Sequence, residues 1–236
     1  MLFMIMLLGA ILGGVGLILT VDNSRYLLSG YNTLDEEERR KIDIVNYVPF
    51  FRKFHLLLAA SLIVIGTASL YLLGEEVTGI VITIYPLLGY LWFISRSSRF
   101  STGSKRWNKI AMVVLGLMIV TIVSLFAVSL QENELYAKDH NVVISGTYGE
   151  DIPTTDIQSL ELVARLPDIS RKTNGFALGK IRKGRFSTSD GEAVKLILNT
   201  NQHPYILLIK KDGEKIYYSS KSRSNEEVYR EVKAIL

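Results

Sequence analysis

The chain contains no cysteine among its 236 residues. Disulfide bonds, thiolate metal sites, iron–sulfur clusters and cysteine nucleophiles are therefore excluded. Its three histidines, His55, His140 and His203, are scattered and match no paired metal-binding motif. The stretch 175–180 has the wrong glycine spacing for a phosphate-binding loop and lacks the Ser or Thr that should follow its lysine. We therefore expect a non-catalytic protein without a cofactor or metal.

Four long apolar runs occupy the first part of the chain. They are residues 1–21, 54–73, 77–95 and 110–130. Each has about the ~20 residues that a helix needs to cross a hydrocarbon core. We interpret residues 1–131 as a transmembrane domain with four spans, and the chain as a multi-pass protein of the cell membrane.

Ionisable side chains are absent from the middle of these four runs, and His55 is expected at an edge. Transporters and proton pumps usually place such groups at mid-membrane. This absence disfavours a transport function.

Basic residues are concentrated in two of the connecting segments. Residues 22–53 contain six Lys or Arg and residues 96–109 contain five, whereas Lys138 is the single basic residue in the first twenty after the last run. The positive-inside rule places both basic loops in the cytoplasm, and four spans then place the C-terminal domain outside. A miscounted span would place it inside. The net charge of +4 comes mostly from these loops, so we expect no nucleic-acid binding.

The first basic loop is predicted to contain a short helix that starts near Leu34. Thr33 and Glu36 have the spacing of a capping box, and acidic residues precede basic ones, as the helix dipole favours. This helix is a candidate docking site for a cytoplasmic partner. The alternative is a solvated helix stabilised by its own ion pairs. Its candidate residues are Thr33, Glu36, Glu37, Arg39 and Arg40.

The motif Gly30-Tyr31-Asn32-Thr33, followed by this Glu-rich and then basic helix, resembles the signature of an uncharacterised family of small bacterial multi-pass membrane proteins. The resemblance covers roughly the first half of the chain. It implies a membrane location and several spans, and it implies no activity. In the first run, Gly9 and Gly13 form a GxxxG pattern that lets another helix approach closely, either within the chain or between two copies.

Beyond residue 131 the pattern changes to short β-rich segments. Strands are predicted at residues 141–148, 157–163, 193–199, 204–209 and 215–220. Asp190-Gly191 and Asp212-Gly213 are predicted hairpin turns in which both central residues take positive φ. Ser224 with Glu227 is a second capping box, before an amphipathic helix that carries Val228, Val232 and Ile235. Residues 139–236 should therefore form a small β-barrel or sandwich of six or seven antiparallel strands, capped by a C-terminal helix.

That order is similar to the bacterial pleckstrin-homology-like (PH-like) domain. The residues that carry the resemblance lie mainly in 143–149, 152–153, 156–157, 166–169, 171–176, 194–196 and 204–206. The resemblance implies a partly open barrel closed by the C-terminal helix.

Eukaryotic relatives of this type often bind inositol phosphates through a basic first loop. This chain instead has Glu150, Asp151 and Asp156 there, which would repel phosphate. Its basic residues cluster later, at Lys180, Arg182, Lys183 and Arg185. This cluster is a candidate lipid or partner patch, and the alternative is a strand edge that charge protects from pairing.

These observations predict a bacterial membrane protein whose extracytoplasmic PH-like domain binds a protein or peptide partner, or senses a signal, without catalysis. Its expected partners are the lipid bilayer and an unidentified protein. The alternatives are an accessory subunit of a membrane transporter and weak binding of anionic lipid by the PH-like domain.

Overall fold

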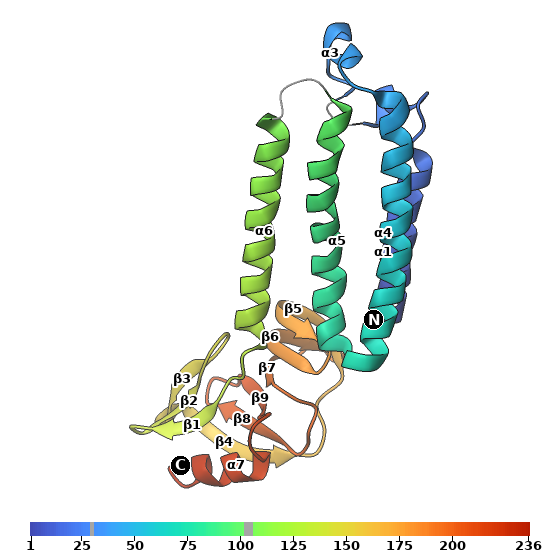
Figure 1. Ribbon diagram of the computed structural model, residues 1–236. Coiled ribbons are helices and arrows are strands. Elements are labelled where there is room, and N and C mark those ends of the chain that lie inside the picture. Colours follow the sequence, from blue (N-terminus) through green and yellow to red (C-terminus); the bar gives the residue numbers. More distant parts are fainter. Residues whose placement is uncertain (29–30, 102–105) are drawn as a thin grey trace. The chain divides into compact units, whose positions relative to one another are not determined.

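The computed structural model describes residues 1–28, 31–101 and 106–236. It divides into two compact units, Met1–Ser124 and Leu125–Leu236. The first contains α1 (Leu2–Ile18), α2 (Ser24–Leu27), α3 (Glu36–Arg40), α4 (Ile44–Leu73), α5 (Glu75–Ser97), η1 (Ser98–Phe100) and most of α6 (Arg106–Leu130) (Figure 1). Gly30 of the Gly-Tyr-Asn-Thr motif and Lys105 of the second basic loop lie outside the described residues.

Within the described part of the chain, three helices are long and apolar enough to cross a membrane, namely α4, α5 and α6. The fourth apolar helix, α1, is shorter, at 17 residues. Helix α4 begins at Ile44, well before the predicted start at residue 54, because the Asp43 carboxylate caps it by accepting from the Asn46 N–H at 3.1 Å. His55 therefore lies inside a helix, and its side chain is buried.

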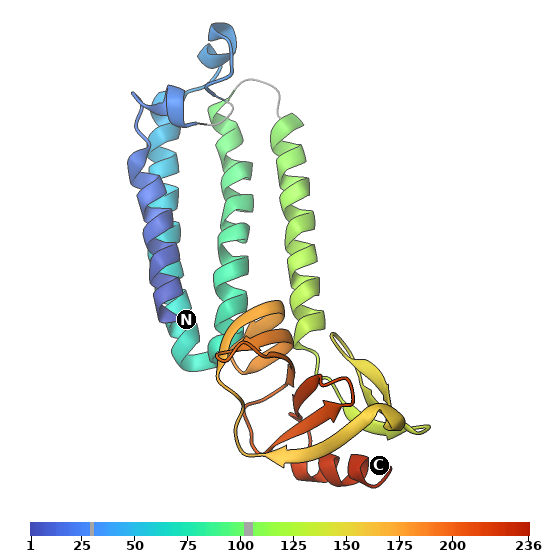
Figure 2. The ribbon, with the colours of Figure 1, turned by 180° about the vertical axis from the view of Figure 1, so that it is seen from behind.

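Helix α1 packs against α4 through its glycines (Figures 1 and 2). A Cβ atom on Gly9 would lie 2.6 Å from the Ile63 side chain, and one on Gly16 would lie 2.7 Å from the His55 Cβ. Only glycine allows the two backbones to approach this closely. Gly9 and Gly16 thus pack α1 on α4 within the chain, whereas a Cβ on Gly13 would make only an ordinary contact, 3.7 Å from the Ala59 Cβ.

The short helix α3 begins later than predicted, at Glu36. Its N-cap is Asp35, whose side chain accepts from the Glu38 N–H at 2.7 Å, and the predicted cap at Thr33 is wrong. The loop offers two acceptor residues at capping spacing, Thr33 before Glu36 and Asp35 before Glu38. The carboxylate at position 35 is the one used, and it also places a negative charge at the positive end of the helix.

The second unit is described in full and contains two sheets. A three-stranded sheet has the order β1-β2-β3, and a six-stranded sheet has the order β4-β8-β9-β7-β6-β5. The strands are β1 (Leu135–Lys138), β2 (Asn141–Ile144), β3 (Glu150–Pro153), β4 (Ile157–Val163), β5 (Ile169–Leu178), β6 (Ile181–Thr188), β7 (Ala193–Leu198), β8 (Tyr205–Lys210) and β9 (Lys215–Ser219). The five predicted strands are all present, and β1, β3, β5 and β6 are additional.

One strand pair departs from the antiparallel prediction. β9 pairs antiparallel with β8 but parallel with β7, with Leu196 opposite Tyr217. The β8–β9 hairpin inserts so that β9, rather than β8, lies beside β7. Sequence periodicity reports which residues face the core, and it contains no information on which strand becomes the neighbour.

The two Asp-Gly hairpins form, but with a different turn geometry. Gly191 and Gly213 take φ of +90° and +89°, whereas Asp190 and Asp212 are not among the residues with positive φ. The prediction of positive φ at both central positions is therefore wrong. A pair of consecutive positive φ values occurs instead at Asp139 and His140, in the tight turn between β1 and β2.

Clusters of buried residues lie on both faces of the six-stranded sheet. On one face, strand residues such as Ile206 and Ile216 pack with the three-stranded sheet and with Val228 and Val232 of α7 (Asn225–Lys233). On the other face, Leu196, Leu198 and Leu207 belong to a second cluster. The capping box of α7 is confirmed, since the Ser224 hydroxyl accepts from the Glu227 N–H at 3.1 Å.

Candidate functional site

The four residues of the predicted basic patch do not form one surface. Lys180 is exposed in the turn between β5 and β6, Arg182 is partly buried, and Arg185 is exposed and lies 3.7 Å from the Glu214 carboxylate. Lys183 is buried, with 1% of its surface exposed, and its ammonium donates to the Gln131 carbonyl. The burial of Lys183 removes it from any headgroup or partner surface.

The edge strand next to this patch has the features of a protected edge. β5 carries Arg171 and Lys172, and its pairing with β6 is interrupted by two register shifts, between Ile169 and Arg171 and between Lys172 and Asn174. Bulges and exposed basic residues are means by which natural sheets prevent edge-to-edge pairing. The geometry thus favours the structural interpretation of the basic residues in this hairpin.

In the predicted docking helix, Arg39 has an internal role. Its guanidinium donates to the Tyr31 carbonyl at 3.2 Å and to the Asn32 carbonyl at 2.9 Å, and it lies 6.0 Å from the centroid of the Tyr31 ring. Arg39 therefore ties α3 to the Tyr-Asn part of the sequence motif. Three of the other candidates, Glu36, Glu37 and Arg40, are exposed, as is Thr33.

The segment that leaves α6 is built into the second unit by a dense polar network, which sequence reasoning missed. Asn133 is fully buried. Its backbone N–H donates to the Asn199 side chain at 3.0 Å. Its backbone carbonyl accepts from the Asn199 side chain and from the Tyr218 hydroxyl, both at 3.0 Å. Its side-chain amide donates to the carbonyls of Ser145 and Thr147. We call residues 131–134 the junction.

The neighbours of Asn133 in the junction are held as well. One carboxylate oxygen of Glu132 accepts from the backbone N–H groups of Lys221 at 2.6 Å and Ser222 at 3.0 Å, and from the Ser220 hydroxyl. These hydrogen bonds lower the pKa of Glu132, although desolvation opposes them. Burial lowers the pKa of Lys183 to about 8, and the charge of Glu132 opposes that shift.

The junction thus joins four separate parts of the domain to the end of α6. The last turn of that helix also contributes, since the rings of Phe126 and Phe176 lie 6.4 Å apart in an edge-to-face arrangement. The side-chain oxygen of Asn133 is buried without a partner, but its other polar groups are hydrogen-bonded, and such a buried network restricts its members to one geometry. The last residues of α6, from Leu125, therefore belong to the same compact unit as the β-sheet domain.

In the first unit, hydrogen bonds between side chains join α4 and α5 at three levels. A His55 ring nitrogen lies 3.1 Å from the Tyr90 hydroxyl, Tyr85 donates to Ser61 at 2.6 Å, and Thr78 donates to Ser69 at 3.2 Å. Such polar contacts between helices stabilise association where the surroundings are apolar. The α4–α5 pair is thus held along its length.

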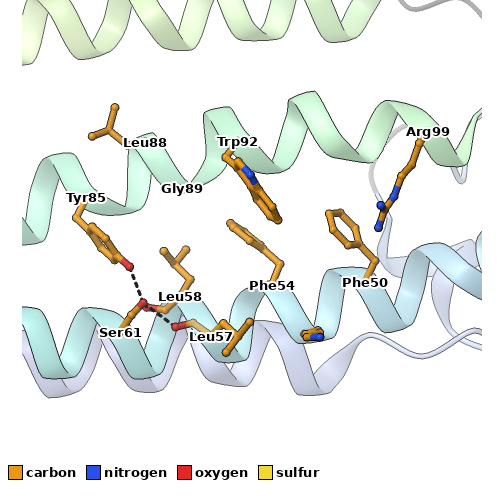
Figure 3. Close-up of a pocket in the computed structure, with 11 residues that line it drawn as sticks. Phe50, Phe54, Leu57, Leu58, Ser61, Tyr85, Leu88, Gly89, Trp92 and Arg99 are labelled. Atoms are coloured by element: carbon orange, nitrogen blue, oxygen red, sulfur yellow. Dashed lines mark hydrogen bonds between the residues drawn. The ribbon is translucent and has the colours of Figure 1, made fainter.

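One side of this helix pair is hollowed into an apolar cavity of about 720 Å³, hereafter the α4–α5 groove (Figure 3). Its walls are mostly aromatic and aliphatic, with Phe54 and Trp92 stacked at a centroid distance of 6.0 Å. Lys53 and Arg99 are its charged lining residues, and the Ser61–Tyr85 hydroxyl pair also borders it. The groove is chemically suited to an elongated apolar molecule with an anionic end.

In the described part of the chain, no three His, Asp or Glu side chains lie together in an arrangement that could hold a metal ion. The molecule is thus a helical unit with three membrane-length helices, followed by a β-sheet domain with a C-terminal helix. Residues 6–101 match the model of a family described as a domain of unknown function, DUF3784. This match supports the resemblance to an uncharacterised family with apolar helices. No curated protein and no solved structure matches the chain.

Proposed function

We propose that this chain is a four-span protein of the bacterial cell membrane whose PH-like C-terminal domain lies outside the cytoplasm and acts as a non-catalytic interaction or sensing module. The junction is the observation on which this proposal rests. A domain that only decorates a membrane protein needs no more than a flexible linker, whereas the buried contacts of Asn133 and Glu132 hold this domain firmly on the end of α6. Binding of a partner to such a domain would be transmitted to the helix as a rigid-body movement.

Helix α1 is the fourth span of this proposal. Its 17 residues reach ~26 Å at 1.5 Å per residue, close to the ~30 Å hydrocarbon core, and this length is at the lower limit for a span. Its glycine face packs on α4, which is itself of membrane-spanning length. Four spans and the distribution of basic residues together favour the outward location of the domain.

The rigid connection is tested by spin labels on the full chain in lipid nanodiscs. The natural absence of cysteine allows two labels to be placed, at Ala127→Cys on α6 and Lys211→Cys in the turn after β8, both exposed and both within the second unit. We expect a single narrow distribution of label distances. Asn199→Ala removes two hydrogen bonds to Asn133 of the junction and one to the Ser219 carbonyl, and it should broaden the distribution.

Asn201→Ala, an exposed neighbour, is the matched control and should leave the distribution narrow. Circular dichroism checks that each variant is folded. A broad distribution in the unmodified chain, or equal widths in Asn199→Ala and the unmodified chain, would contradict the proposed transmission.

The location of the domain is tested by thiol labelling of single cysteines in intact cells. We expect a membrane-impermeant reagent to label Lys211→Cys in the domain, because that site should lie outside. Glu37→Cys in α3 should be labelled only after the cells are permeabilised, because it belongs to a basic loop that should be cytoplasmic. The reverse pattern would show that the domain lies inside and would contradict the proposed orientation.

A further inference from the structure

The α4–α5 groove has one charged end and an apolar remainder. Phe50, Phe54, Leu57 and Leu88 are among its walls, and Lys53 and Arg99 supply its positive charge. No carboxylate is among the described residues that line it. Its volume of about 720 Å³ is within the range of ~300–1,000 Å³ typical of small-molecule sites.

The two cations are available to an outside ligand. Both side chains are exposed, and within the described residues neither forms an ion pair with a carboxylate. The Arg99 guanidinium lies over the rings of Phe50 and Phe100, at 4.8 and 4.7 Å from their centroids. These contacts orient Arg99 beside the groove and leave its N–H groups able to donate to a phosphate oxygen. Figure 3 shows Arg99 and Phe50 at one end of the groove and Tyr85 at the other.

The depth of the groove fits a lipid in the surrounding bilayer. Residues 54–73 of α4 cover ~30 Å at 1.5 Å per residue, which is the thickness of a hydrocarbon core. Lys53 precedes this stretch and therefore belongs to the headgroup layer, together with the aromatic residues that gather there, such as Tyr47 and Phe50. The apolar part of the groove then extends from the headgroup layer into the hydrocarbon.

We propose that the α4–α5 groove is a binding site for an anionic glycerophospholipid. The phosphate is held by Lys53 and Arg99, and one acyl chain lies against Phe54, Leu57 and Trp92. Leu58 of α4 forms the floor of the site. α5 approaches Leu58 closely because Gly89 has no side chain: a Cβ on Gly89 would lie 2.8 Å from the Leu58 side chain. This site is separate from the second unit and does not depend on the function proposed for that domain.

The fluorescence of Trp92 can report lipid binding, because Trp92 lines the groove and the chain has only one other tryptophan, Trp107. The full chain with Trp107→Phe is reconstituted in phosphatidylcholine vesicles that contain increasing fractions of phosphatidylglycerol with brominated acyl chains, which quench tryptophan on contact. We expect Trp92 to be quenched at much lower mole fractions of brominated phosphatidylglycerol than of brominated phosphatidylcholine. Two near-surface cations correspond to a roughly 30-fold preference.

Variants separate the site from general attraction to charge. Lys53→Gln with Arg99→Gln should remove the preference. Arg96→Gln with Lys109→Gln is the matched control: it removes the same charge from two exposed residues outside the groove and should retain most of the preference. Leu57→Trp should fill the groove with a larger side chain. Because the added tryptophan would confuse the fluorescence signal, this variant is tested by the amount of phosphatidylglycerol that copurifies with it in mild detergent. That amount should fall.

Three results would overturn the proposal. Equal quenching by the two brominated lipids would show a groove without headgroup selectivity. Equal losses in the two double variants would show attraction to the surface rather than binding in the groove. Absence of quenching by either lipid would show that protein, either another helix or a second copy, fills the groove.

Discussion

Gly184→Ala should destabilise the C-terminal domain by about 4 kcal/mol or more, or prevent it from folding. Gly184 has a φ of +116°, and a Cβ there would lie 2.3 Å from the Asn174 carbonyl oxygen and 2.6 Å from the Gly175 Cα. Both contacts are with backbone that is fixed by the β5–β6 ladder, in which Gly175 pairs with Gly184. Strain in φ costs about 1–3 kcal/mol, and steric overpacking costs a similar amount.

The measurement is urea unfolding of the full chain in detergent, monitored through the fluorescence of a label attached to Lys211→Cys. Gly191→Ala is the matched control, because Gly191 has a φ of +90° but an added Cβ would meet no atom within 4 Å. Gly191→Ala should therefore lose only the free energy that a non-glycine residue pays for positive φ, about 1–2 kcal/mol. If both variants lost the same stability, the close contact between β5 and β6 would have no energetic importance.

The domain should also become more stable as the pH rises from about 8 to about 10.5, because of Lys183. Burial lowers its pKa to about 8 in the folded state, from the ordinary lysine value of 10.5. Between these values the unfolded chain binds more protons than the folded chain, so the free energy of unfolding increases with pH. The shift corresponds to about 3 kcal/mol, which is lost as the pH falls from about 10.5 to about 8, below which the contribution of Lys183 is constant.

Comparison with Lys183→Met isolates this effect from the titration of other groups. Relative to that variant, the unmodified domain should gain about 3 kcal/mol of unfolding free energy across the interval. Lys172→Met removes an exposed lysine of β5 and should parallel the unmodified protein throughout. A constant difference between the unmodified protein and Lys183→Met would show that Lys183 is not perturbed, and that it is accessible to solvent.

Local patterns in the sequence located several elements well. The predicted strand 157–163 coincides with β4, the Ser224 cap begins α7, and Asp190-Gly191 and Asp212-Gly213 lie in hairpin turns. Each depends on neighbours in sequence: alternation along one strand, an acceptor beside a helix start, or a glycine in a turn. β5 and β6 were missed because Lys, Arg and Gly interrupt their alternation, and this irregularity reflects bulges that form only when the two strands pair.

The candidate sites were harder to predict than the elements. The cluster Lys180–Arg185 looks uniform as a sequence, yet Lys183 is buried and Arg185 is exposed. The junction could not be predicted from the sequence, since Asn133 and Asn199 are far apart in the chain and no spacing rule connects them. The α4–α5 groove could not be predicted either, because Lys53 and Arg99 come from separate segments of the chain.

The sequence by itself determined that the chain has apolar helices of membrane length, a polar C-terminal part rich in strands, no cysteine chemistry, and basic residues gathered in particular loops. These properties follow from composition and from periods of a few residues. Tertiary structure alone decided that β9 lies parallel to β7, that Lys183 is buried, that Asn133 closes the junction and that two helices enclose a groove with cations at one end. All four depend on contacts between residues distant in the chain, and the free energy of such contacts depends on which surfaces meet.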